Sequence, residues 1–200
     1  MAARFSARCG KMAKAYRPIQ LLAGVELKIE PSQVSVKGRL GSLTLPIPAG
    51  LDIKLHGQEI SVTAEPGTDR AIIGTTRVLL NNMIVGVTSG YQKVVELRGM
   101  GYRVQKTKAG IQINCGFSHP VDVAAPPGIN FEINQVPNPE DTKEQMFEII
   151  VSGPDKQLVG DVAAKIRAIK PADPYHGKGF RYRGERVRKK AGKRAVAAQA

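Results

Sequence analysis

An eight-residue pattern occurs twice in this chain and restricts its fold more than any other feature. The segments GTDRAIIG (67–74) and GPDKQLVG (153–160) share the frame Gly-x-Asp-basic-x-aliphatic-aliphatic-Gly. A second pair, PAGL (48–51) and PPGI (126–129), precedes them in the same order. The offset is 78 residues in the second pair and 86 in the first, which leaves eight additional residues for a loop at 137–145. Two matches in the same order predict a duplicated structural unit.

Each copy combines short strands with one helix. Alternation of apolar and polar residues predicts strands in the first copy near 25–29, 34–36, 43–45, 51–55 and 60–62. The second copy repeats this near 94–97, 102–104, 111–113, 121–123, 131–133 and 147–151. Helical spacing follows at 68–85 and 155–169, where Asp69 and Asp155 are suited to cap the helices. We therefore expect an α+β fold with two tandem duplicated domains, each a small mainly antiparallel sheet packed with one helix, plus a basic C-terminal extension.

Four segments follow from the repeat and the charge: a basic N-terminal extension (1–17), two repeat domains (18–86 and 87–170) that meet near 86–90, and a basic C-terminal segment and tail (171–200). The N-terminal extension fits either an organellar transit peptide or an addition before a core that begins at Met12, and the sequence favours neither. Two cysteines, Cys9 and Cys115, indicate a reducing compartment. No apolar run approaches the roughly 20 residues of a membrane helix, so we expect no membrane partner.

The positive charge of the chain is concentrated at its two ends. Residues 1–17 hold five basic residues and no acidic one, and residues 171–194 hold nine basic and two acidic residues. The two ends thus contribute +5 and +7 of the net +13, and the remainder of the chain is almost neutral. Such asymmetry is typical of a protein that binds a polyanion, with RNA as the foremost candidate.

The C-terminal segment combines the residue types that bind RNA. Its glycines would let the backbone approach a phosphate, its Lys and Arg side chains would donate to phosphate oxygens, and its aromatic rings would stack on bases or pack back on the domain. From Arg186 to Arg194 the chain is a plain basic run, which we interpret as a flexible arm. The candidate RNA-binding residues are Lys170, Tyr175, Gly177, Lys178, Gly179, Arg181, Tyr182, Arg183, Arg186, Arg188, Lys189 and Lys190.

Catalytic and cofactor sites find little support in the sequence. Ser118 and His119 are adjacent, but adjacent side chains rarely aim at one another as a catalytic pair does, and no acid is placed to orient the histidine. The Gly99-Met100-Gly101-Tyr102 segment lacks the third glycine and the lysine of a phosphate-binding loop, so we expect a bend between strands there. We therefore predict a protein that is not an enzyme and that has no catalytic residue, metal site or cofactor.

The segment from Asp173 to Tyr182 resembles the signature of the bacterial-type ribosomal protein L6 family of the large subunit. The chain departs from that signature at Ala172, just before this segment, and at His176 and Phe180. Four other stretches are similar to the same family: 77–90, 99–103, 116–121 and 155–160. The resemblance implies a structural constituent of the large ribosomal subunit that binds 23S-type rRNA, mainly through its second domain.

The same resemblance implies a location near the sarcin–ricin loop and the factor-binding centre, with neighbouring large-subunit proteins and elongation factors close by. Such ribosomes occur in the bacterial cytoplasm and in the matrix of mitochondria and plastids, and the sequence leaves all three open. A free RNA chaperone or architectural nucleic-acid-binding module is the alternative function.

Overall fold

The computed structural model describes residues 18–64, 68–137 and 145–190. The chain divides into two compact units, 1–89 and 90–200, each with its own hydrophobic core. The N-terminal extension lies outside the described residues, as do Gly67 of the first repeat motif and residues 138–144 of the predicted loop insertion.

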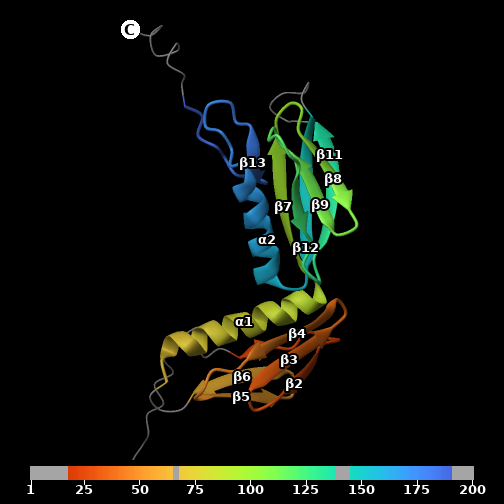
Figure 1. Ribbon diagram of the computed structural model, residues 1–200. Helices are drawn as coiled ribbons and strands as arrows, with labels where there is room; N and C mark the ends of the chain where they lie inside the picture. The colour runs from red at the N-terminus through yellow and green to blue at the C-terminus, as the bar shows by residue number, and fades with distance from the viewer. Residues whose placement is uncertain (1–17, 65–67, 138–144, 191–200) are drawn as a thin grey trace, which may run out of the picture. The chain divides into compact units, whose positions relative to one another are not determined.

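The described residues of the first unit form two antiparallel sheets and one helix (Figure 1). One sheet has the order β2-β3-β4 and the other the order β1-β6-β5. The strands are β1 (Ile19–Gln20), β2 (Glu26–Ile29), β3 (Gln33–Gly38), β4 (Gly41–Pro46), β5 (Leu51–His56) and β6 (Glu59–Ala64), and the helix is α1 (Arg70–Thr88). Two sheets are present where the sequence predicted one.

Helix α1 covers the core of the first unit. Its Leu80, Ile84 and Val87 are at most 1% exposed, and the helix contacts β3, β4 and β6. Asp69 caps the N-terminus as predicted, since its side chain accepts a hydrogen bond from the amide of Ala71. Contrary to our expectation from the sequence, α1 is long and apolar enough to cross a membrane, with 19 residues and a hydropathy of 1.3. Its packing against three strands is that of a core helix.

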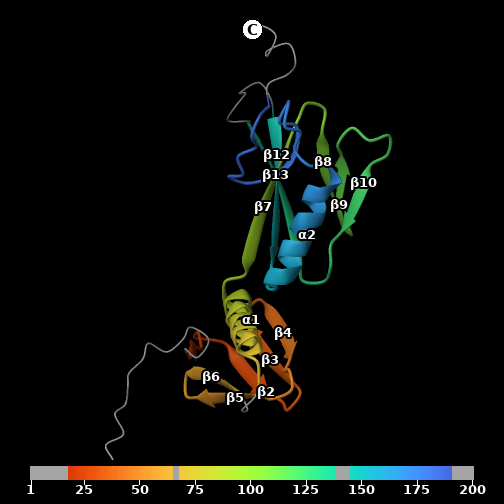
Figure 2. The same ribbon diagram turned by 90° about the vertical axis from the view of Figure 1, so that its left-hand side faces the viewer.

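The second unit repeats this architecture (Figure 2). A three-stranded sheet has the order β10-β9-β8, and a four-stranded sheet has the order β11-β12-β7-β13. The strands are β7 (Tyr91–Arg98), β8 (Arg103–Thr107), β9 (Gly110–Asn114), β10 (Val121–Ala124), β11 (Asn130–Pro137), β12 (Gln145–Gly153) and β13 (Gly179–Tyr182), and the helix is α2 (Lys156–Ile169). Helix α2 packs on β7, β12 and β13, and its Val162 and Ile166 are buried in the core.

Strand order supports the duplication read from the sequence. In the first unit β6 lies between β1 and β5, and in the second unit β12 lies between β7 and β11 in the same way. Asp155 caps α2 by accepting from the amide of Gln157, just as Asp69 caps α1. The predicted loop insertion at 137–145 coincides with the connection between β11 and β12, whose terminal residues Pro137 and Gln145 are paired. The predicted α+β fold with two repeated halves is thus confirmed.

The junction of the two units falls inside the expected range 86–90. Helix α1 continues through Val87 and Thr88, and Ser89 ends it by donating its amide to the carbonyl of Val85, so the units divide after Ser89, three residues beyond Gly86. The segment expected to extend beyond the second domain is part of it, because β13 pairs with β7. Among the described residues of the first unit, β1 has no partner strand corresponding to β13.

Candidate nucleic-acid interface

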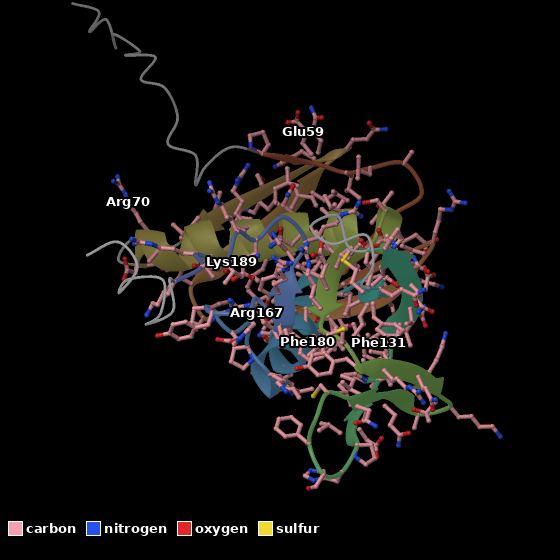
Figure 3. All side chains as sticks on the ribbon, turned by 90° about the horizontal axis from the view of Figure 1, so that it is seen from above. Glu59, Arg70, Phe131, Arg167, Phe180 and Lys189 are labelled. Carbon is pink, nitrogen blue, oxygen red and sulfur yellow. The ribbon has the colours of Figure 1, made fainter. Side chains whose placement is uncertain are left out.

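The C-terminal segment returns to the sheet directly after α2. Lys170 ends the helix, and its carbonyl accepts a hydrogen bond from the amide of Phe180 at 2.8 Å. Gly179 makes this return possible: its φ is +126°, and a Cβ there would lie 2.7 Å from the carbonyl oxygen of Pro171. The Phe180 ring, labelled in Figure 3, is fully buried against the core. Residues 171–182 are therefore anchored by backbone pairing and by one aromatic ring.

Asp173 shapes the loop that precedes β13. Its carboxylate accepts the amides of Tyr175 at 3.0 Å and His176 at 3.3 Å, and the ring Nδ1 of His176 lies 2.9 Å from the same group. Its carbonyl accepts the amide of Gly177 at 2.7 Å, and its own amide donates to the carbonyl of Lys178. These contacts, the Tyr175 amide first and the His176 ring next, lower the pKa of Asp173. The loop is therefore held in one conformation by an ionised carboxylate.

Glu185 joins the segment beyond β13 to helix α2. Its carboxylate accepts hydrogen bonds from Arg167 at 2.5 and 3.2 Å and from the amide of Tyr182 at 3.0 Å. The Arg167 guanidinium and the Tyr182 amide, in that order, lower the pKa of Glu185. The same pairing raises the pKa of Arg167, whose guanidinium also lies 5.4 Å from the centre of the Tyr182 ring. The chain after Tyr182 therefore leaves the sheet in a defined direction.

A charged cluster lies buried beneath this segment. Glu96 of β7 is paired in register with Arg181 of β13, and the two residues are 5% and 6% exposed. The Glu96 carboxylate contacts Arg98 at 2.9 Å and the Nε of Arg181 at 3.6 Å. Two guanidinium groups thus share one carboxylate, and a second buried carboxylate, Glu148 of β12, is paired in register with Glu96.

Above this cluster the segment forms one wall of a groove of about 850 Å³. We call it the basic groove; it is lined by Arg98, Gly177, Arg181, Gly184, Glu185, Arg186, Val187, Arg188 and Lys189. Five of these residues are basic, and the single acidic one, Glu185, is neutralised by Arg167. Arg186, Arg188 and Lys189 are exposed. The groove therefore presents guanidinium and ammonium donors to solvent in an arrangement suited to phosphate oxygens.

The structure divides the predicted RNA-binding residues into two groups. One group is exposed or half-exposed on the C-terminal segment: Tyr175, Lys178, Arg183, Arg186, Arg188, Lys189 and Lys190. The other group has structural contacts: Arg181 is buried on Glu96, Gly179 faces the Pro171 carbonyl, and Gly177 is buried beside Lys189. Tyr182 lies between Lys93 and Arg167, and Lys170 donates to the Cys115 carbonyl at 2.6 Å. The contacts of this second group hold the segment in place, and RNA binding by any of the twelve residues stays a prediction.

Sequence reasoning missed the residues that position the groove. Arg98, Asp173 and Glu185 were not among the candidates, although all three orient the segment or line the groove. The two carboxylates were available as a signal, because they are the only acidic residues in the basic stretch 171–194. Arg98 gave no such signal, since only the pairing of β13 with β7 brings it near the segment.

Similarity to known proteins supports an assignment. The family model "Ribosomal protein L6" matches residues 23–90 and 98–183, which cover most of both units and the C-terminal segment as far as Arg183. The chain is 43% identical over 181 residues to "Large ribosomal subunit protein uL6" of Xanthomonas axonopodis pv. citri (strain 306), covering 90% of this chain and 98% of that protein. It is 44% identical over 179 residues to the protein of the same name from Listeria monocytogenes serotype 4a (strain HCC23), covering 88% and 95%. The matched length, identity and repeated fold together establish that this chain belongs to the ribosomal protein L6 family.

Proposed function

We propose that this chain is a structural constituent of the large ribosomal subunit and binds 23S-type rRNA through the basic groove of its second unit. The relatives from Xanthomonas and Listeria are named large ribosomal subunit proteins. The observation that carries the RNA-binding role is the groove itself, where Arg186, Arg188 and Lys189 are exposed along a segment anchored in the sheet.

Family membership also identifies the chain as a structural protein and not an enzyme. Its contribution is then mechanical: it holds RNA segments and neighbouring proteins in place. We propose a position near the sarcin–ricin loop and the factor-binding centre, where elongation factors pass. This position follows from the resemblance of 173–182 to the family signature.

The fixed backbone of the segment makes this binding favourable. The backbone of the segment is held before RNA binds by Asp173, Glu185 and Phe180. Less conformational entropy is therefore lost when RNA binds. We therefore expect the second unit to dominate the affinity.

Filter binding of the full-length protein to an rRNA fragment that contains the sarcin–ricin loop tests this proposal. If about six basic groups meet phosphates, affinity should fall about 10³-fold between about 50 and 200 mM salt. Replacing Arg186 and Arg188 by alanine should weaken binding and reduce the salt slope by about 2, whereas R39A, an exposed arginine of the first unit, should change neither. Binding that does not depend on salt, or an equal effect of R39A, would contradict the proposal.

Sedimentation separates this function from that of a free RNA chaperone. A structural constituent cosediments with the large subunit after the two subunits are dissociated at low magnesium concentration. A protein found only at the top of the gradient would favour the chaperone. The compartment is addressed by sequencing the N-terminus of the mature protein: loss of residues near 1–17 would identify an organellar precursor, and an intact terminus would fit the bacterial cytoplasm.

A further inference from the structure

A second exposed surface of the second unit carries aromatic rings that the basic groove does not use. It is formed by the loop between β7 and β8 (99–102) and the loop between β9 and β10 (115–120). The first loop connects two strands, as the sequence predicted. We call the surface the loop platform and define it by Tyr102, Phe117 and His119, with Lys170 beneath them.

Lys170 joins the two loops. Its ammonium donates to the Cys115 carbonyl at 2.6 Å and lies 4.9 Å from the centre of the Tyr102 ring and 5.6 Å from that of Phe117. The cation is thus occupied by one carbonyl and two π faces, which fixes the rings relative to the end of α2. Figure 2 shows the loop after β9 at the end of the second unit where α2 finishes.

Glycines allow this close assembly. A Cβ on Gly99, whose φ is +144°, would lie 2.4 Å from the Tyr102 ring. A Cβ on Gly116, whose φ is +82°, would lie 3.3 Å from the Lys170 ammonium. The two loops therefore fold directly over the ring and the cation, and larger side chains would separate them.

The outer rings remain at the surface. Phe117 is 44% exposed, and His119 is also exposed. Their ring centres are 6.4 Å apart and their planes differ by 22°, so a planar group can lie against either ring in nearly the same orientation. Core packing does not explain why the exposed Phe117 ring is held in place by the Lys170 ammonium.

The surroundings point to an RNA base as the planar group. Arg103, which is exposed, directly follows Tyr102, and Lys170 leads without a break into the segment that lines the basic groove. Arg98, which lines that groove, directly precedes the loop 99–102 of the platform, so RNA whose phosphates lie in the groove passes beside this loop. We propose that Phe117 and His119 form a stacking site for an unpaired nucleobase of the bound RNA. This inference rests on the proposed RNA-binding function and adds a contact that carries no charge.

Tryptophan fluorescence offers a direct test, because the chain contains no tryptophan. The variant F117W places a single indole on the platform. L55W serves as a matched control, since Leu55 of the first unit is also 44% exposed. Each variant is titrated with a short single-stranded oligoadenylate and with an RNA duplex of the same length, both labelled so that fluorescence anisotropy reports binding independently.

Stacking predicts that oligoadenylate quenches F117W as anisotropy rises, that the duplex quenches it much less, and that L55W is unaffected. If anisotropy rises while F117W emission stays constant, or if L55W is quenched equally, the stacking site is refuted and the basic groove stands. If neither RNA raises the anisotropy even at low salt, the stacking site is refuted, and the filter-binding measurement with the rRNA fragment decides the proposed function separately.

Salt dependence provides a second readout. F117A should bind oligoadenylate about 5- to 100-fold more weakly than the unaltered protein, the range observed when one base–aromatic stack is lost. The slope of affinity against salt should stay the same, because no charge is removed. H119A should act in the same direction, and H56A, which removes an exposed histidine of the first unit, should have no effect. An unchanged affinity in F117A would overturn the inference.

Discussion

Replacing Phe180 by alanine tests whether the basic C-terminal segment is part of the second unit or a tail attached to it. The Phe180 ring is fully buried, and its residue pairs with Leu97 across β13 and β7. Truncating a buried phenylalanine to alanine costs about 3–5 kcal/mol, from lost transfer free energy and the cavity left behind. A domain of this kind has a total stability of about 5–15 kcal/mol, so the loss is a large fraction of it.

Urea unfolding monitored by tyrosine fluorescence measures this loss. Four of the five tyrosines, Tyr91, Tyr102, Tyr175 and Tyr182, belong to the second unit, so the signal reports mainly on that unit. With a urea dependence of about 2 kcal/mol per molar, F180A should lower the midpoint of this transition by about 2 M. The first unit, followed by circular dichroism, should unfold at an unchanged urea concentration.

The matched control is F117A. Phe117 is 44% exposed on a loop, so its removal should lower the free energy of unfolding by less than about 1 kcal/mol. If F180A and F117A lowered the free energy of unfolding by equal small amounts, β13 would contribute nothing to the stability of the fold. In that case the anchoring on which the basic groove depends would be absent.

Three further predictions concern the residues that hold the segment. The pKa of Glu185 is lowered in the folded protein, so its contribution to stability is complete above the ordinary carboxyl range and is lost as the pH falls through its folded pKa. The variant E185Q should therefore remove this pH dependence from urea unfolding. The control E132Q, at an exposed position of the same unit, should retain it. The pKa of Asp173 is also lowered, because its ionised carboxylate accepts the amides of Tyr175 and His176. Hydrogen exchange should therefore show these two amides protected at neutral pH and unprotected in acid. In D173A they should lack protection at every pH. G179A should destabilise the second unit by more than G184A. Both glycines have positive φ, which costs about 1–3 kcal/mol in a non-glycine residue, but only at Gly179 would the added Cβ meet a carbonyl oxygen. Equal decreases in the melting temperature of the two variants would contradict this.

The local pattern of this chain determined most of its fold. Period-two alternation and helical spacing placed α1, α2 and eleven of the thirteen strands found in the described residues. The Gly-x-Asp frame identified the caps of both helices, because an aspartate in that position satisfies free amides of the first turn. The residues of the family signature were enough to predict the ribosomal protein L6 family, which the matches to both units confirm.

Strands β1 and β13 were missed for a shared reason. Strand β1 has two residues and β13 has four, so neither is long enough to show a period. In β13 the aromatic residues Phe180 and Tyr182 do alternate around Arg181, but glycines and basic residues on both sides favoured a loop. Both strands form by pairing with distant residues, Ile19 with Ile60 and Phe180 with Leu97, and such pairing is decided by the tertiary structure.

The positions of Lys and Arg along the sequence determined which segments of this protein carry the positive charge, and the tertiary structure determined which of these charges reach the surface. Arg181, Arg186 and Arg188 look equivalent in the sequence, yet Arg181 is buried on Glu96 because β13 places it opposite that carboxylate, and the other two are exposed. Phe180 and Phe117 are likewise both aromatic residues beside glycines, and only the fold makes one an anchor and the other an exposed ring. The reason is physical: burial and ion pairing depend on which strands pair in the sheet. Those strands are far apart in the sequence, so a pattern of a few residues does not show which of them pair.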